Sequence, residues 1–178
     1  MTKQTTIAAL IWTTALGIAA IFGSYVFACV FPFAAVATIA ALTLDARRGV
    51  ALVMATWVAN QVVGFAFMHF PQTFDTVALG ISLGLGAVCA YAVAYSVVRH
   101  ARTPVRIFAA LGGAFIAYQL VIYAGALGFG GADNFSATII RAVALNDAIW
   151  FTALYALHAG LTRALPDLFG KRGLAVSA

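Results

Sequence analysis

Apolar runs of about 20 residues or more recur along this chain of 178 residues, and only short polar segments separate them. Runs of that length are what a helix needs to cross the hydrocarbon core of a bilayer. Of all residues, 64% are hydrophobic and 8% are charged, whereas soluble domains carry about 25% charged residues. We therefore predict an all-α, polytopic membrane protein in which residues 1–178 form a single integral membrane domain.

The positive charges indicate how such a protein is oriented. They gather in separate clusters: Lys3; Arg47 and Arg48; Arg99, Arg102 and Arg106; Arg163, Lys171 and Arg172. The loops 69–75 (HFPQTFD) and 128–136 (GFGGADNFS) between them carry no lysine or arginine. Cytoplasmic loops of membrane proteins are enriched in these residues, so we expect both termini in the cytoplasm and the chain in the cytoplasmic (inner) membrane. The basic residues then contact anionic lipid headgroups and not nucleic acid.

This orientation requires an even number of crossings before the 45–48 loop. Proline suits the first turn of a helix, so we place the first break at Cys29–Pro32. The sequence then predicts a compact bundle of about six transmembrane helices, at residues 5–28, 32–44, 49–69, 76–98, 105–127 and 137–162. The second span is short, about 20 Å at 1.5 Å per residue. Either its turn lies earlier, near Gly23 and Ser24, or the bilayer thins there.

Small residues four apart recur within these spans and allow helix backbones to approach closely. They are Ala15, Ala19 and Gly23; Ala37 and Ala41; Gly80 and Gly84; Gly113 and Ala117. They indicate either packing inside the bundle or docking onto a partner subunit.

Polar residues within the spans are the candidate site residues, because burying them in lipid is costly. Trp57, Asn60, Gln61 and Gly64 share one face of the third span. Further candidates at comparable depth are Gln119, Tyr123, Asn146, Asp147 and Trp150. Together they predict a polar layer near the middle of the membrane, which is either a hydrogen-bonded core or the floor of a cavity.

Asp147 is the most informative of these residues. A lone carboxylate at that depth must be protonated or paired, and its candidate partners are Asn146, Gln61 and Arg141. Asp147 and His158 fall on roughly the same face of the last span, which leaves proton transfer in a membrane enzyme as a minor alternative. Nucleophile, nucleotide-binding and zinc-protease motifs are all missing, so we expect no enzyme.

Cys29 lies at the outer end of the first span, beside the proline-broken turn. It either packs as a small apolar residue or provides a thiolate ligand to a soft metal, only through a bound metal cofactor. No histidine and cysteine pair has metal-site spacing within one helix.

Six short spans, both termini inside, an alanine-rich first helix with Ala15 and Ala19, and very short loops resemble the substrate-binding S-components of energy-coupling factor transporters. The resemblance implies capture of a vitamin or metal cofactor at a pocket near the outer surface. It also implies that small residues of the first helix, here Ala15, Ala19 and Gly23, dock on a transmembrane coupling subunit that works with ATPases. The chain is similar to the solitary BtuM-like cobalamin proteins in having a cysteine, here Cys29, that can reach cobalt, so cobalamin is a candidate ligand.

On this basis we expect uptake of a small molecule across the membrane. The outer rim of the pocket would be formed by Cys29, His69, Gln72, Asp133 and Asn134. Polar groups below it would be Asn60, Gln61, Gln119, Asn146 and Asp147, with Tyr25, Trp57, Tyr123 and Trp150 as walls. The alternative is a non-catalytic subunit or assembly factor of a larger membrane complex, in which the polar layer only holds helices together.

Overall fold

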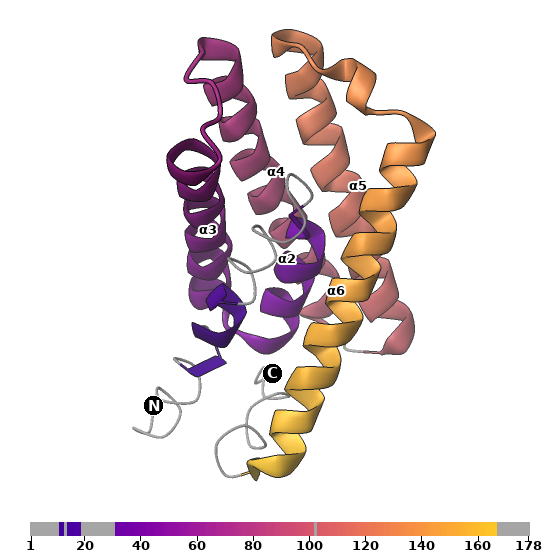
Figure 1. The fold of residues 1–178 in the computed structure, drawn as a ribbon. Helices are drawn as coiled ribbons and strands as arrows, with labels where there is room; N and C mark the ends of the chain where they lie inside the picture. Colours follow the sequence, from indigo (N-terminus) through magenta and orange to yellow (C-terminus); the bar gives the residue numbers. More distant parts are fainter. Residues whose placement is uncertain (1–10, 13, 19–30, 102, 167–178) are drawn as a thin grey trace.

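The computed structural model describes residues 11–12, 14–18, 31–101 and 103–166, and every regular element in these ranges is a helix (Figure 1). Their order is α2 (Phe33–Thr43), α3 (Ala46–Val62), the π-helix η1 (Val63–Phe67), α4 (Phe74–Val98), α5 (Pro104–Phe129), the 3₁₀-helix η2 (Ala132–Asn134) and α6 (Ala137–Ala164). Residues 14–18 are also helical. The prediction of an all-α chain is confirmed for the described residues.

Four helical segments are long and apolar enough to cross a membrane, namely Ala46–Phe67, Phe74–Val98, Pro104–Phe129 and Ala137–Ala164. They match the last four predicted spans to within three residues at each end. Most of the predicted first span, 5–28, lies outside the described residues, as do the chain termini.

The predicted second span, 32–44, does not form a helix of spanning length. It forms α2, which has 11 residues and measures about 16 Å, whereas the hydrocarbon core is about 30 Å thick. Figure 1 shows α2 starting partway along the bundle and running to the end where α3 begins. An apolar segment can be buried by protein as well as by lipid, and composition does not distinguish the two.

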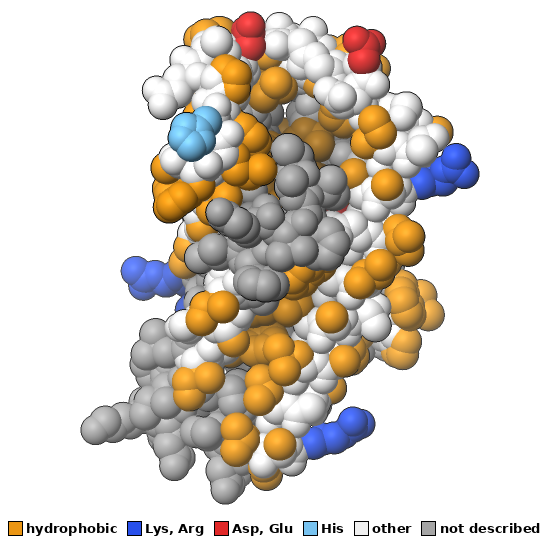
Figure 2. Space-filling model, viewed as in Figure 1, with side chains coloured by type: hydrophobic (Ala, Val, Ile, Leu, Met, Phe, Trp, Pro, Cys, Tyr) orange, Lys and Arg blue, Asp and Glu red, His pale blue; other side chains and the backbone are white. Residues whose placement is uncertain are grey.

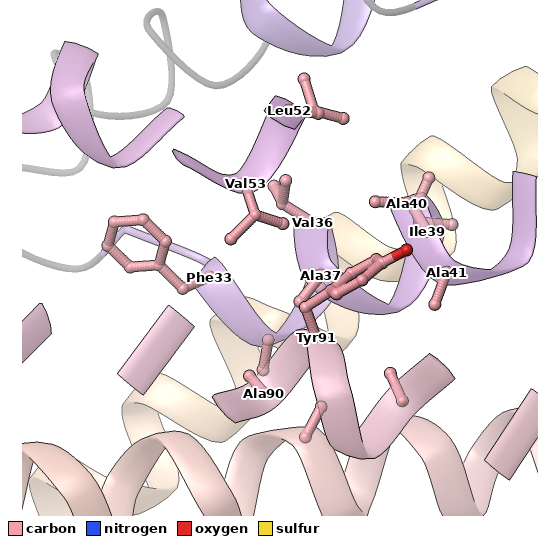
Figure 3. Packing of buried hydrophobic residues seen from close by; sticks show 14 of the residues in the cluster. Phe33, Val36, Ala37, Ile39, Ala40, Ala41, Leu52, Val53, Ala90 and Tyr91 are labelled. Carbon is pink, nitrogen blue, oxygen red and sulfur yellow. The ribbon is translucent and has the colours of Figure 1, made fainter. Parts of the chain in front are cut away.

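The core of the bundle is built around α2, which contacts α3, α4, α5 and α6. All its residues from Phe33 to Leu42 are buried. Leu52 and Val53 of α3 pack on one side of it, and Ala90 and Tyr91 of α4 pack on another (Figure 3). Small side chains permit this close approach. The helix α2 therefore fills the centre of the bundle.

Glycines of α4 provide the surface on which α3 packs. A Cβ atom added at Gly84 would lie 2.7 Å from the indole of Trp57, and one added at Gly80 would meet the amide of Gln61. Gly113 of α5 is similarly close to Val93 of α4. The small residues of α2, α4 and α5 therefore serve internal packing. In the first predicted span, Ala15 is half-buried, and Ala19 and Gly23 lie outside the described residues.

The four long helices begin at residues whose side chains cap them. Asp45, Thr73, Thr103 and Ser136 each accept a hydrogen bond from the N–H three residues later, which satisfies an amide that the helix leaves unpaired. The loops that follow η1 and α5 lie at one end of the bundle, and the α2–α3 and α4–α5 connections lie at the other (Figure 1). The acidic side chains visible in Figure 2 lie at the first of these ends.

Gly84→Ala tests the packing of α3 on α4. The added methyl group would displace Trp57, and overpacking of this kind costs about 1–3 kcal/mol. Gly112→Ala is the matched control, because a Cβ atom there meets nothing within 4 Å. We expect thermal unfolding in detergent at a lower temperature for Gly84→Ala only; equal effects of the two substitutions would contradict the packing described.

Candidate functional site

A cavity of about 150 Å³ lies between the start of α2, the end of α3 and the adjoining parts of α4 and α5. Its lining residues are Phe31, Phe33, Asn60, Val63, Gly64, Met68, Phe70, Leu83 and Tyr118. Four of these nine residues are aromatic, and the amide of Asn60 and the phenol of Tyr118 are the polar side-chain groups. An apolar wall with few polar groups is typical of small-molecule sites.

The π-helix η1 shapes one wall of this cavity. It ends at Phe67, and His69, two residues later, has a φ of 56°, an uncommon conformation outside glycine. The N–H of Met68 donates to the carbonyl of Val63 at 2.9 Å, and the N–H of Phe70 donates to the carbonyl of Gly64 at 3.1 Å. The chain thereby folds back, and the ring of Phe70 covers Gly64 so closely that a Cβ atom there would lie 2.9 Å from it.

The residues of the polar face predicted on the third span have two different roles, contact with α4 and lining of the cavity. Trp57 donates from Nε1 to the carbonyl of Gly80 at 2.8 Å, and Gln61 lies against Gly80 and donates to Oδ1 of Asn60 at 3.3 Å. These two side chains join α3 to α4. Asn60 and Gly64 face the cavity.

Asp147 of α6 caps the buried N-terminus of α2. The residue before α2 is Pro32, which provides no side-chain cap, and Oδ1 of Asp147 accepts the N–H of Ala35 at 2.8 Å instead. Oδ2 of Asp147 has no hydrogen-bond partner among the described residues. Asp147 is 2% exposed. Although it lies 112 positions from Ala35 in the sequence, it pairs an amide that α2 cannot pair by itself.

Two of the candidate partners predicted for Asp147, Gln61 and Arg141, have other contacts in the described residues. Gln61 packs on α4. Arg141 is exposed, and its Nε donates to the carbonyl of Ala137 at 3.3 Å, within its own helix. Asn146 precedes Asp147 and is half-buried. The carboxylate instead accepts a hydrogen bond from an amide of α2. The free amides at the start of that helix need an acceptor, because they lie in the centre of the bundle.

The remaining predicted site residues are spread over the molecule. His69 and Gln72 are exposed in the loop after η1, and Asp133 and Asn134 are exposed in η2. Gln119 and Trp150 are half-buried, and Tyr123 is 40% exposed with its ring 5.0 Å from that of Phe135. His158 packs edge-on against Trp12 at 4.9 Å. Cys29 and Tyr25 lie outside the described residues, so their predicted roles stay predictions. No cluster of three or more metal-ligating side chains occurs in the described ranges.

Sequence reasoning missed most of the cavity wall, namely Phe31, Phe33, Met68 and Phe70, and did not include Tyr118 among the site residues. Aromatic and methionine side chains in an apolar chain carry no signal of their own. The one available signal was the pair of phenylalanines that flanks Pro32. Comparisons with protein-family models, with curated proteins and with solved structures gave no match.

Replacing Asp147 tests its role as a cap. Asp147→Ala leaves the Ala35 amide buried without an acceptor, at a cost of about 1–3 kcal/mol. Asp147→Asn keeps an acceptor oxygen, so we expect a smaller loss. Unfolding of the detergent-solubilised protein would measure both, with the exposed Asp133→Ala as the control. If Asp147→Ala unfolds like the wild type, the cap does not stabilise the bundle.

Proposed function

We propose that this chain is a multi-pass protein of the cytoplasmic membrane that captures a small molecule in the cavity beside η1. The observation that carries this proposal is the cavity itself, which combines a largely apolar wall with the Asn60 amide and the Tyr118 phenol. Such a combination binds a ligand by burial and orients it by a few polar contacts.

The size of the cavity limits the ligand. A cavity of about 150 Å³ accommodates a molecule near the size of benzene, and sites for drug-sized ligands measure about 300–1,000 Å³. Cobalamin is far larger than either, so we do not propose it as the occupant of this cavity. Capture of a small ligand is compatible with an S-component-like role, in which Ala15, Ala19 and Gly23 would dock on a coupling subunit.

The alternative is a non-catalytic subunit of a larger membrane complex. One observation favours it: Trp57 and Gln61, two of the predicted ligand-binding residues, join α3 to α4. In such a subunit the cavity would be an incidental packing gap. The two functions differ in whether ligands bind there.

Filling the cavity distinguishes them. Leu83 lines the cavity, so Leu83→Phe should occupy it and abolish the melting-temperature increase that a panel of small amines, alcohols and aromatic molecules gives with the wild type. Leu85→Phe, on the exposed face of the same helix, should leave that increase unchanged. If no compound in the panel stabilises the wild type, or if both variants respond alike, the capture function is wrong.

The proposed orientation puts the arginine-bearing end of the bundle in the cytoplasm. In a variant whose native Cys29 and Cys89 are replaced, a cysteine at Thr73 should react with a membrane-impermeant maleimide added to intact cells. A cysteine at Arg99, at the other end of α4, should react only after the membrane is opened. The reverse labelling pattern would show that the protein has the opposite orientation in the membrane.

A further inference from the structure

The cavity beside η1 is lined without charge. None of the described residues that line it is charged, and the buried Asp147 is not one of them. The stretch of chain that leads into Phe31 carries no charge either, because no acidic, basic or histidine residue occurs between Lys3 and Asp45. A charged ligand would leave water for a site that offers no opposite charge, which is costly. The lining therefore favours an uncharged ligand.

Aromatic rings form much of the cavity wall. The ring centroid of Phe33 lies 4.4 Å from that of Phe31, with the planes inclined by 50°, and 5.5 Å from that of Tyr118, with the planes inclined by 37°. A fourth ring, that of Phe70, covers Gly64. Offset and edge-on contacts between aromatic rings are more favourable than the buried area alone accounts for. Leucine and valine would enclose an aliphatic ligand equally well, so this wall favours a ligand with an aromatic ring.

The cavity volume and Met68 suit a single ring. A cavity of about 150 Å³ matches the apolar cavities that hold benzene in other proteins. Met68 also lines the cavity. Its unbranched side chain adapts to irregular space, and a thioether sulfur makes favourable contacts with aromatic rings. One aromatic ring therefore fits the volume and finds both aromatic neighbours and a polarisable sulfur in the lining.

Two polar side chains favour a polar substituent on that ring. They are Asn60 of α3 and Tyr118 of α5. Oδ1 of Asn60 accepts a hydrogen bond from Gln61 at 3.3 Å, and a carbonyl oxygen has a second lone pair with which to accept another. The hydroxyl group of a tyrosine both donates and accepts. A hydroxyl group on the ligand can bond to either side chain, whereas an unsubstituted ring would cover them without forming a hydrogen bond.

We infer that the cavity selects an uncharged molecule with one aromatic ring and a hydrogen-bonding substituent such as a hydroxyl group. This inference rests on the proposed capture function and names its ligand class. The ring packs against Phe31, Phe33 and Phe70, and the substituent bonds to Asn60 or Tyr118. An ammonium or carboxylate substituent is disfavoured, because the lining offers it no counter-charge.

Three pairs of ligands test the three parts of this inference. Phenol and cyclohexanol share the hydroxyl group and differ in the aromaticity of the ring. Phenol and toluene share the aromatic ring and differ in the hydroxyl group. Benzyl alcohol and benzylamine have nearly the same shape, but the amine is protonated at neutral pH.

Calorimetric titration of the wild type at neutral pH, in a maltoside detergent and phosphate buffer, would measure the six affinities, with protein-free micelles as the blank. Phenol should bind at least about threefold more tightly than cyclohexanol. It should also bind at least as tightly as toluene, although toluene leaves water more readily. Benzyl alcohol should bind at least about tenfold more tightly than benzylamine. These comparisons need no substitution, so they do not depend on the folding of a variant.

Substitutions locate the binding site. Leu83→Phe should abolish binding of phenol, because it fills the cavity, and Leu85→Phe should leave that binding unchanged. Phe70→Leu removes one ring from the wall and should reduce the preference for phenol over cyclohexanol. Phe67→Leu is the matched control, because Phe67 is exposed and does not line the cavity, and it should leave the preference unchanged.

The contrary results are equally specific. Equal affinities for phenol and cyclohexanol, tighter binding of toluene than of phenol, or equal affinities for benzylamine and benzyl alcohol would each overturn the inference and leave small-molecule capture standing. Phenol binding that survives Leu83→Phe would place the site elsewhere and overturn the inference. If phenol does not bind to a protein that other compounds stabilise through this cavity, the inference alone is wrong. If no compound binds, the capture function is wrong as well.

Discussion

The hydrogen bond from the Ala35 amide to Asp147 is the interaction on which the arrangement of this bundle depends. A helix that begins in the interior leaves amides unpaired, and neither water nor the side chain of Pro32 can pair them. An acceptor must therefore come from another helix. On α6, Asp147 forms one buried stripe with Phe151 and Leu154, and that stripe faces α2. The bond thus fixes both the start of α2 and the position of α6 along it.

Placing an apolar helix at the centre has consequences for all its neighbours. Because α2 is rich in alanine and buried from Phe33 to Leu42, the surrounding helices approach it through small residues such as Ala90 of α4 and Ala114 of α5. The polar side chains of α3 are then directed to other surfaces. Trp57 and Gln61 pack on the glycines of α4, and Asn60 faces the remaining space beside η1.

That space exists because α3 does not continue as a regular helix. The π-helical turn and the left-handed His69 widen the end of α3 and return Phe70 over Gly64. π-Helical turns often occur at functional sites. The same region contains the start of α2, so that the aromatic wall and the amide of Asn60 lie around one cavity. This juxtaposition is the basis on which we propose small-molecule capture.

The sequence by itself determined the helical class and the four long apolar helices and singled out Asp147 as a carboxyl group within them, because apolar length and a rare acidic residue can be read without knowing what they contact. It did not determine that residues 33–43 lie within the bundle, since apolar helices look alike whether lipid or protein surrounds them. Only the tertiary structure decided the partner of Asp147 and the wall of the cavity. Those depend on contacts between residues such as Ala35 and Asp147, or Phe33 and Tyr118, that are far apart in the sequence and meet only after the helices pack.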